Sequence, residues 1–89
     1  MFKCDDTRAL FEGQRVPRFV NIQTLALRKL AMLNRVTQIE ELRIPPGNRL
    51  EALKGDRQNQ FSIRINEQWR VCFAFENGHA LNVEIVDYH

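Results

Sequence analysis

The sequence predicts an α+β fold in which N-terminal helices pack on one face of a small antiparallel β-sheet. Apolar residues in the first half of the chain recur at three- and four-residue spacing, which is typical of amphipathic helices. In the second half they occupy every other position, which is typical of strands with one buried face. The pair Asn77-Gly78 between the last two alternating segments is a strong signal for a two-residue hairpin. Helices followed by a meander of strands indicate this fold class.

Length and composition restrict the class of protein further. The chain has 89 residues, of which 44% are hydrophobic and 27% charged, so residues 1–89 are predicted to form one domain. No apolar run approaches the about 20 residues of a membrane span, and the N-terminal stretch lacks the apolar core of a secretory signal. We therefore expect a cytoplasmic protein that makes no use of the membrane.

The cysteine pattern does not indicate a metal site. Cys4 and Cys72 are far apart and form no CxxC motif, and a disulfide framework normally has more cysteines. Cys72 lies in an apolar strand pattern, which favours a packing role over a nucleophilic one. We expect no metal and no cofactor.

The first elements are a strand and a short helix. Residues 1–4 fit a short edge strand. Asp5 and Asp6 then stand where N-capping residues belong, before a short helix that ends near Gly13.

The main helix is predicted to cover Phe19–Asn34, where the apolar spacing is most regular. Residues 37–40 have the Thr-x-x-Glu form of a capping box, so a short helix through Leu42 is expected next. The sequence Pro-Pro-Gly-Asn at 45–48 ends this helix with a turn.

The sheet is predicted to contain four strands, with a turn at 66–68. Their expected ranges are 49–53, 61–65, 69–76 and 81–86.

Strand alternation also predicts which side chains face away from the helices. If the apolar positions of strand 69–76 meet the helices, the other face of the sheet is open and carries two arginines and a tyrosine. Such a platform suits phosphate groups and bases. The predicted members of this face are Arg64, Arg70, Cys72, Glu84, Val86 and Tyr88.

Charge is distributed unevenly, although the net charge is only +2. The segment from Arg43 to Arg70 contains six basic and three acidic residues, and no lysine or arginine follows it. A basic patch would suit phosphate. On charge alone, however, a solvated face with scattered counter-charges is the favoured interpretation.

RNA cleavage without a metal needs a base for the 2′-OH, cations for the charged phosphorane and an acid for the leaving 5′-oxygen. The sequence supplies residue types suited to these three tasks near the predicted open face. The candidates are Glu51, Asp87 and His89 for proton transfer, Lys54, Arg49, Arg57, Arg64 and Arg70 for phosphate or RNA, and Tyr88 for stacking or proton donation.

Each candidate also has a purely structural interpretation. His89 is the last residue, and terminal residues are usually frayed. Glu51 could simply pair with an arginine, Arg70 could be a satisfied surface residue, and His79 follows the hairpin turn. The residues alone do not favour a nuclease over a non-catalytic RNA-binding module.

Several segments together resemble the HigB toxins of the RelE/ParE superfamily, also called plasmid-maintenance killer proteins. The segments are Asn48–Arg57 with its L-K-G-D-R motif, Ser62–Asn66, Gln68–Arg70 with Q-W-R, and the terminal Asp87–His89 with D-Y-H. The likeness covers nearly the whole chain.

The resemblance implies a toxin of a bacterial type II toxin–antitoxin system that cuts messenger RNA in the A site of the 70S ribosome. The implied partner is a HigA-type antitoxin with a helix-turn-helix domain, so operator DNA would be contacted only indirectly. By the family pattern, Lys54 and Arg70 polarise the scissile phosphate. Asp87, Tyr88 and His89 form the C-terminal part of the site, and His89 is the favoured proton-transfer residue.

One position departs from the family pattern. Some HigB toxins have a histidine where this chain has Glu51, and a carboxylate lacks the near-neutral pKa of imidazole. The resemblance therefore implies a slower or differently tuned nuclease. A ParE-like inhibitor of DNA gyrase on the same fold is the alternative function, although the acid–base cluster at the C-terminus favours the nuclease.

Overall fold

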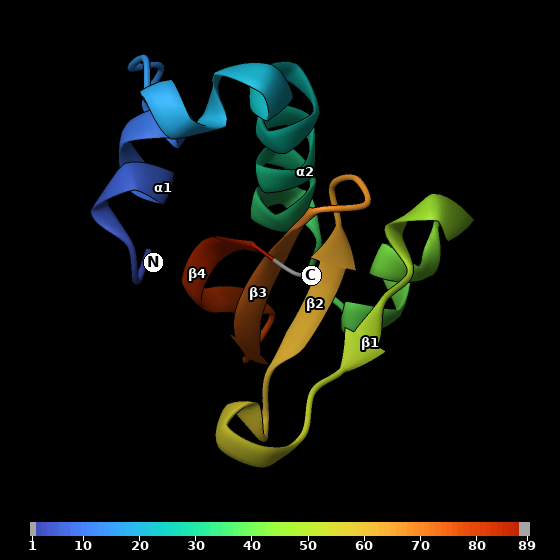
Figure 1. Cartoon of the computed structure of the whole chain (residues 1–89). Coiled ribbons are helices and arrows are strands. Elements are labelled where there is room, and N and C mark those ends of the chain that lie inside the picture. Colours follow the sequence, from blue (N-terminus) through green and yellow to red (C-terminus); the bar gives the residue numbers. More distant parts are fainter. Residues whose placement is uncertain (1, 88–89) are drawn as a thin grey trace.

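The computed structural model describes residues 2–87 of the chain, so Tyr88 and His89 lie outside the described residues. The fold is α+β, with two α-helices followed by a four-stranded antiparallel sheet (Figure 1). The strand order is β1-β2-β3-β4. The elements are α1 (Asp5–Phe11), α2 (Gln23–Arg35), β1 (Glu51–Ala52), β2 (Phe61–Arg64), β3 (Trp69–Glu76) and β4 (His79–Asp87).

The helical half differs from the prediction at the start of each helix. The predicted helix from Phe19 begins as a 3-10 helix, Pro17–Ile22, and becomes α-helical only at Gln23. Pro17 stands at the first position of the 3-10 helix, where its missing N–H costs nothing. The N-cap of α1 is Cys4, so Asp5 and Asp6 are not caps but lie in the first turn, where carboxylates favour the helix dipole.

The predicted capping box is displaced by one residue. The helix after α2 is a 3-10 helix, Ile39–Arg43, and its N-cap is Gln38 instead of Thr37. Glu41 Oε1 accepts the backbone N–H groups of Thr37 at 2.8 Å and of Gln38 at 2.9 Å. These hydrogen bonds from Gln38 and Thr37 lower the pKa of Glu41, since they stabilise its charged form.

The four predicted strands are present, although β1 is shorter than expected and β4 begins earlier. The hairpin at Asn77-Gly78 is confirmed, since both residues have positive φ, 51° and 79°, and Glu76 pairs with His79 across the turn. At the other end of β3, the side-chain oxygen of Asn66 accepts two backbone N–H groups and closes the predicted turn.

A bulge in β4 breaks the predicted alternation. Cys72 pairs with Glu84 and Ala74 with Leu81, so β4 contains one residue more than β3 in this interval. Asn82 has φ 53°, a left-handed conformation that asparagine tolerates better than most residues. The alternation of side chains that includes Leu81 is therefore shifted by one residue relative to the part of β4 beyond the bulge.

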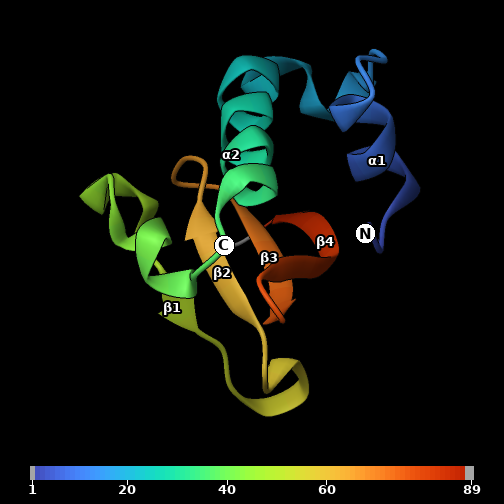
Figure 2. The same ribbon diagram turned by 180° about the vertical axis from the view of Figure 1, so that it is seen from behind.

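Residues of both halves contribute to one hydrophobic cluster. Phe19 is fully buried, and its ring meets that of Trp69 edge-on with centroids 5.4 Å apart. Figures 1 and 2 show α1 and α2 joined by the 3-10 helix above the strands, with α1 and β1 at opposite sides of the molecule. The buried members of the cluster are Leu10, Val16, Phe19, Ile22, Ala26, Leu30, Leu33, Leu42, Ile63, Ile65, Val71, Phe73, Val83 and Ile85. Among the helices of residues 2–87, none has the length and apolar character needed to cross a membrane.

The N-terminal segment is joined to the last strand. Phe2 forms a parallel bridge with Val83, and Thr7, which is fully buried, accepts the backbone N–H of Ile85 on its hydroxyl at 3.0 Å. This bond connects α1 directly to β4.

Replacing Thr7 by valine is expected to destabilise the fold by about 1–3 kcal/mol, because the shape is kept while the buried N–H of Ile85 loses its acceptor. For a domain of this size, each 1 kcal/mol lowers Tm by about 4–8 °C. Thermal unfolding followed by circular dichroism measures the effect, with the exposed Thr24→Val as the matched control. Equal melting temperatures for the two variants would contradict a stabilising role for this bond.

Candidate active site

The sheet face that carries Arg70 is not the open platform that strand alternation predicts. The register does place Ser62, Cys72 and Glu84 in one row and Arg64 and Arg70 in the next, as expected. Yet Ser62 and Cys72 are completely buried, and Arg70 is only 9% exposed. Long charged side chains cover this face, since their stems can lie along a surface while their charged ends reach partners or water.

Three groups fix the guanidinium of Arg70. Its Nε donates to Ser62 Oγ at 2.9 Å, and its Nη2 donates to the backbone oxygen of Arg49 at 2.6 Å. The same Nη2 lies 3.1 Å from Glu51 Oε1. Arg70 is therefore not a surface arginine, and the pairing of Glu51 with an arginine is confirmed.

A cavity of about 230 Å³ opens beside this guanidinium. Three arginines line it together with one acidic side chain, so its charge favours an anion. A guanidinium presents N–H groups in a planar fork that matches phosphate oxygens. The lining residues are Arg49, Arg64, Asn66, Glu67 and Arg70.

The position of Arg49 in this cavity depends on a buried asparagine. Asn48 is completely buried, and its Nδ2 donates to the backbone oxygen of Leu42 at 3.0 Å. Lys29 of α2 donates to the side-chain oxygen of Asn48, and burial lowers the pKa of this lysine. Arg49 follows with φ 46°, a left-handed turn that directs the chain into β1.

Asp87 lies at the same end of the sheet as the cavity. It pairs with Trp69 in the register, and its Oδ2 accepts the side-chain N–H of Gln68 at 3.1 Å. The turn 66–68 therefore lies between the cavity and the last described residue. The predicted roles of Tyr88 and His89 fall outside the described residues.

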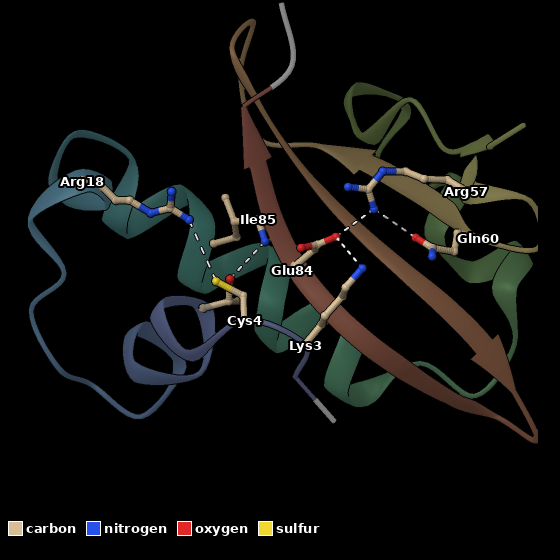
Figure 3. Close-up of polar contacts among 8 residues, drawn as sticks. Lys3, Cys4, Arg18, Arg57, Gln60, Glu84 and Ile85 are labelled. Carbon is tan, nitrogen blue, oxygen red and sulfur yellow. Dashed lines mark hydrogen bonds and ion pairs between the residues drawn. The ribbon is translucent and has the colours of Figure 1, made fainter. Parts of the chain in front are cut away.

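Lys54 and Arg57 do not line the cavity. Lys54 is exposed and stands directly before a 3-10 helix, Gly55–Arg57. Arg57 Nη1 contacts Glu84 Oε1 at 2.8 Å and Gln60 Oε1 at 3.3 Å (Figure 3). The structure thus groups Arg49, Arg64 and Arg70 and gives Arg57 a partner of its own on the same sheet face.

The chemistry of Cys72 agrees with a packing role. Burial raises the pKa of its thiol above the ordinary value, although Arg57 acts in the opposite direction. A protonated thiol is a weak nucleophile. Within residues 2–87, no three His, Cys, Asp or Glu side chains are grouped as metal ligands.

A larger cavity, of about 470 Å³, lies at the other end of the β3–β4 hairpin. Its walls include Phe2, Phe11, Leu33 and Val83, and among the described residues no lysine or arginine lines it. It therefore lacks the cations that would hold a phosphate. His79 also lines this cavity, away from the cationic one.

Sequence reasoning assigned no role to two residues that hold candidate arginines in place. Ser62 binds the guanidinium of Arg70, and Glu84 binds Arg57. A signal for Ser62 existed, because a small hydroxyl stands on the same strand face as Arg64, two positions away. No local signal identifies Glu84, since its partner is 27 positions away in the sequence.

Comparison with known proteins agrees with the resemblance found in the sequence. A family model described as the RelE-like toxin of the type II toxin–antitoxin system HigB matches residues 2–89. The chain is 44% identical over 83 residues to Toxin HigB-1 of Vibrio cholerae serotype O1, an alignment that covers 91% of this chain and 87% of that protein.

Two other relatives match over shorter segments. Endoribonuclease HigB of Proteus vulgaris is 38% identical over 65 residues, which cover 68% of this chain and 65% of that protein. An uncharacterized protein of Haemophilus influenzae is 36% identical over 63 residues, 71% of this chain and 62% of that protein. The alignments thus span just under two thirds of these two relatives. Since the family model and the Vibrio relative cover nearly all of the sequence, the chain belongs to the HigB-like family, the RelE-like toxins of type II toxin–antitoxin systems.

Proposed function

We propose that this toxin is an endoribonuclease that cuts messenger RNA in the A site of the 70S ribosome, and hence acts in the cytoplasm. The Proteus vulgaris relative bears the name of an endoribonuclease, which supports the activity. The observation that carries the proposal is the cavity beside Arg70, which three arginines line at the end of the sheet where Asp87 lies.

In this proposal the cavity holds the scissile phosphate. Arg70 is already fixed by Ser62 and the Arg49 backbone, so it needs little reorganisation to stabilise the charge that develops on the phosphorane. Arg49 and Arg64 add positive charge around the same group. Lys54 would approach the phosphate from the loop after β1.

His89 is the favoured residue for proton transfer, and Glu51 and Asp87 are the other side chains that could exchange protons. His89 would exchange protons with the 2′-OH or the leaving 5′-oxygen, while Asp87 and Tyr88 orient the substrate and the histidine. We propose that these side chains act without a metal ion.

Glu51 gives the site a particular property, because its carboxylate already lies 3.1 Å from Nη2 of the Arg70 guanidinium. A phosphate that binds Arg70 would compete with this carboxylate. The family histidine in this position would not compete in the same way.

Glu51→His is therefore expected to raise the cleavage rate severalfold, because it removes a competing anion and supplies a base of near-neutral pKa. Single-turnover cleavage on ribosomes measures the change. Glu51→Gln is the matched control, since it removes the charge and adds no base. If Glu51→His leaves the rate unchanged or lowers it, Glu51 does not limit the nuclease.

The function itself is tested with a defined messenger on programmed 70S ribosomes. We expect wild-type toxin to cut at the A-site codon and to cut the same RNA weakly or not at all without ribosomes, because the ribosome holds the substrate in line for attack. Efficient cleavage of free RNA would contradict ribosome dependence. Growth arrest without RNA cleavage would instead favour inhibition of DNA gyrase, which a supercoiling assay detects.

A toxin of this class is paired with an antitoxin. We propose an antitoxin of the HigA type with a helix-turn-helix domain, through which the pair would reach operator DNA. A non-catalytic RNA-binding module is the remaining alternative. It predicts salt-sensitive RNA binding that needs Lys54 and Arg70 but not His89.

We also propose that residues 1–89 form a single RelE/ParE-like domain whose N-terminal helices cover one face of the sheet. The shared hydrophobic cluster and the contact between Phe19 and Trp69 support this arrangement.

A further inference from the structure

Glu84 binds cations from two distant segments of the chain. Its Oε1 lies 2.8 Å from Arg57 Nη1 and 3.6 Å from Lys3 Nζ, and its side chain is only 16% exposed. Figure 3 shows the arginine reaching this carboxylate from above and the lysine from below. The group lies over the fully buried Cys72, the register partner of Glu84.

The arginine in this group is carried by the loop that connects β1 and β2. Lys54 opens the 3-10 turn that Arg57 closes, and the backbone N–H of Arg57 donates to the Lys54 carbonyl at 3.3 Å. The backbone N–H of Gln60 donates in turn to the Arg57 carbonyl at 3.0 Å. The backbones of Arg57 and Lys54 are thus joined within one short turn.

This loop has little apolar contact with the body of the protein. Lys54, Gly55, Asp56, Gln58 and Asn59 are all exposed. Residues 54–60 include no member of the hydrophobic cluster or of the apolar side chains packed against it. Polar contacts therefore hold the loop, and in the ion pair the Glu84 side chain is 16% exposed and the Arg57 side chain 35%. Removing one partner of such a partly buried pair leaves the charge of the other uncompensated.

We propose that Glu84 is a positioning residue that acts through Arg57. It holds loop 54–60, and with it Lys54, in the place from which the lysine reaches the scissile phosphate. This inference rests on the proposed nuclease function. It changes the role of Arg57 from direct RNA binding to the support of Lys54.

The test compares Glu84→Gln with wild type in ribosome-programmed cleavage. We expect the rate at saturating ribosomes to fall about tenfold or more, since small displacements of a positioning group have large effects on rate. The ribosome concentration at half-maximal rate should change little. Glu76→Gln, an exposed carboxylate on the same hairpin, is the matched control and should cleave like wild type.

A second measurement does not depend on activity. In amide hydrogen exchange, Glu84→Gln should accelerate exchange at residues 57, 58 and 60, whose N–H groups close the loop, and leave the amides of β3 unchanged. The triple variant Lys3→Glu/Arg57→Glu/Glu84→Arg restores both ion pairs of position 84 with reversed charges. It should recover most of the lost rate and the slow exchange.

The outcomes separate this inference from the function on which it rests. If wild type cuts no RNA on ribosomes, the nuclease proposal fails, whatever exchange shows. If wild type cuts and Glu84→Gln cuts equally well, the positioning role is wrong. A fall in rate without faster exchange in the loop would also overturn it, because Glu84 would then act by another route.

Discussion

Arg70→Lys is expected to lower the rate of ribosome-programmed RNA cleavage by about 100-fold or more, the usual effect of losing one preorganised donor to a transition-state oxyanion. Lysine keeps the positive charge but cannot reach Ser62, the Arg49 carbonyl and Glu51 at once, as the guanidinium fork does. The remaining ammonium would be neither fixed in direction nor bidentate toward a phosphate. Single-turnover cleavage at saturating ribosomes measures the loss.

Two controls make this result specific. Arg35→Lys, at the exposed end of α2, makes the same chemical change away from the cavity and should leave cleavage unchanged. Denaturant unfolding of Arg70→Lys shows whether the variant is folded under assay conditions. A folded Arg70→Lys protein that cuts at the wild-type rate would remove Arg70 from the active site.

Loss of the C-terminal histidine is expected to have an effect of similar or greater size. We expect His89→Ala to lower cleavage about 100- to 10,000-fold, the range that general acid–base catalysis contributes. A chain that ends at Val86 should be inactive, because it also loses Asp87 and its contact with Gln68. Cleavage at A-site codons of a defined messenger measures both variants.

The second histidine of the chain provides the matched control. His79 lies at the hairpin turn, beside the apolar cavity, and His79→Ala should cut like wild type. If His89→Ala keeps the wild-type rate, proton transfer must be reassigned to Glu51 or Asp87. If the truncated chain still cuts, the C-terminal cluster has no part in the reaction.

Features encoded in short stretches of sequence were predicted well. The α+β class and the order of elements follow from the change of apolar spacing between the two halves. The hairpin at Asn77-Gly78 depends on two residues that tolerate positive φ. The common face of Arg64 and Arg70 follows from strand alternation and is confirmed by the register.

Features that depend on distant contacts were not predictable in this way. The sheet face of Cys72 was expected to be open, but Arg57 crosses from its loop to Glu84 and covers it. The bulge at Asn82 arises from the fit between two strands, which no single strand reveals. The charges of the candidate site were visible in the sequence. The contact of the Arg49 carbonyl with Arg70, in contrast, follows the buried Asn48, whose contact with Leu42 is not apparent from the sequence.

The pairing of the N-terminal segment with β4 also restricts when the protein can fold. Phe2 bridges Val83, and the hydrogen bond between Thr7 and Ile85 joins residues 78 positions apart. Contacts of such long sequence separation cannot form on a nascent chain until the later residue has been synthesised. Until residues 83–85 have been synthesised, α1 therefore has no strand on which to dock. The candidate site, which includes Asp87 from the same strand, can be assembled only after that point.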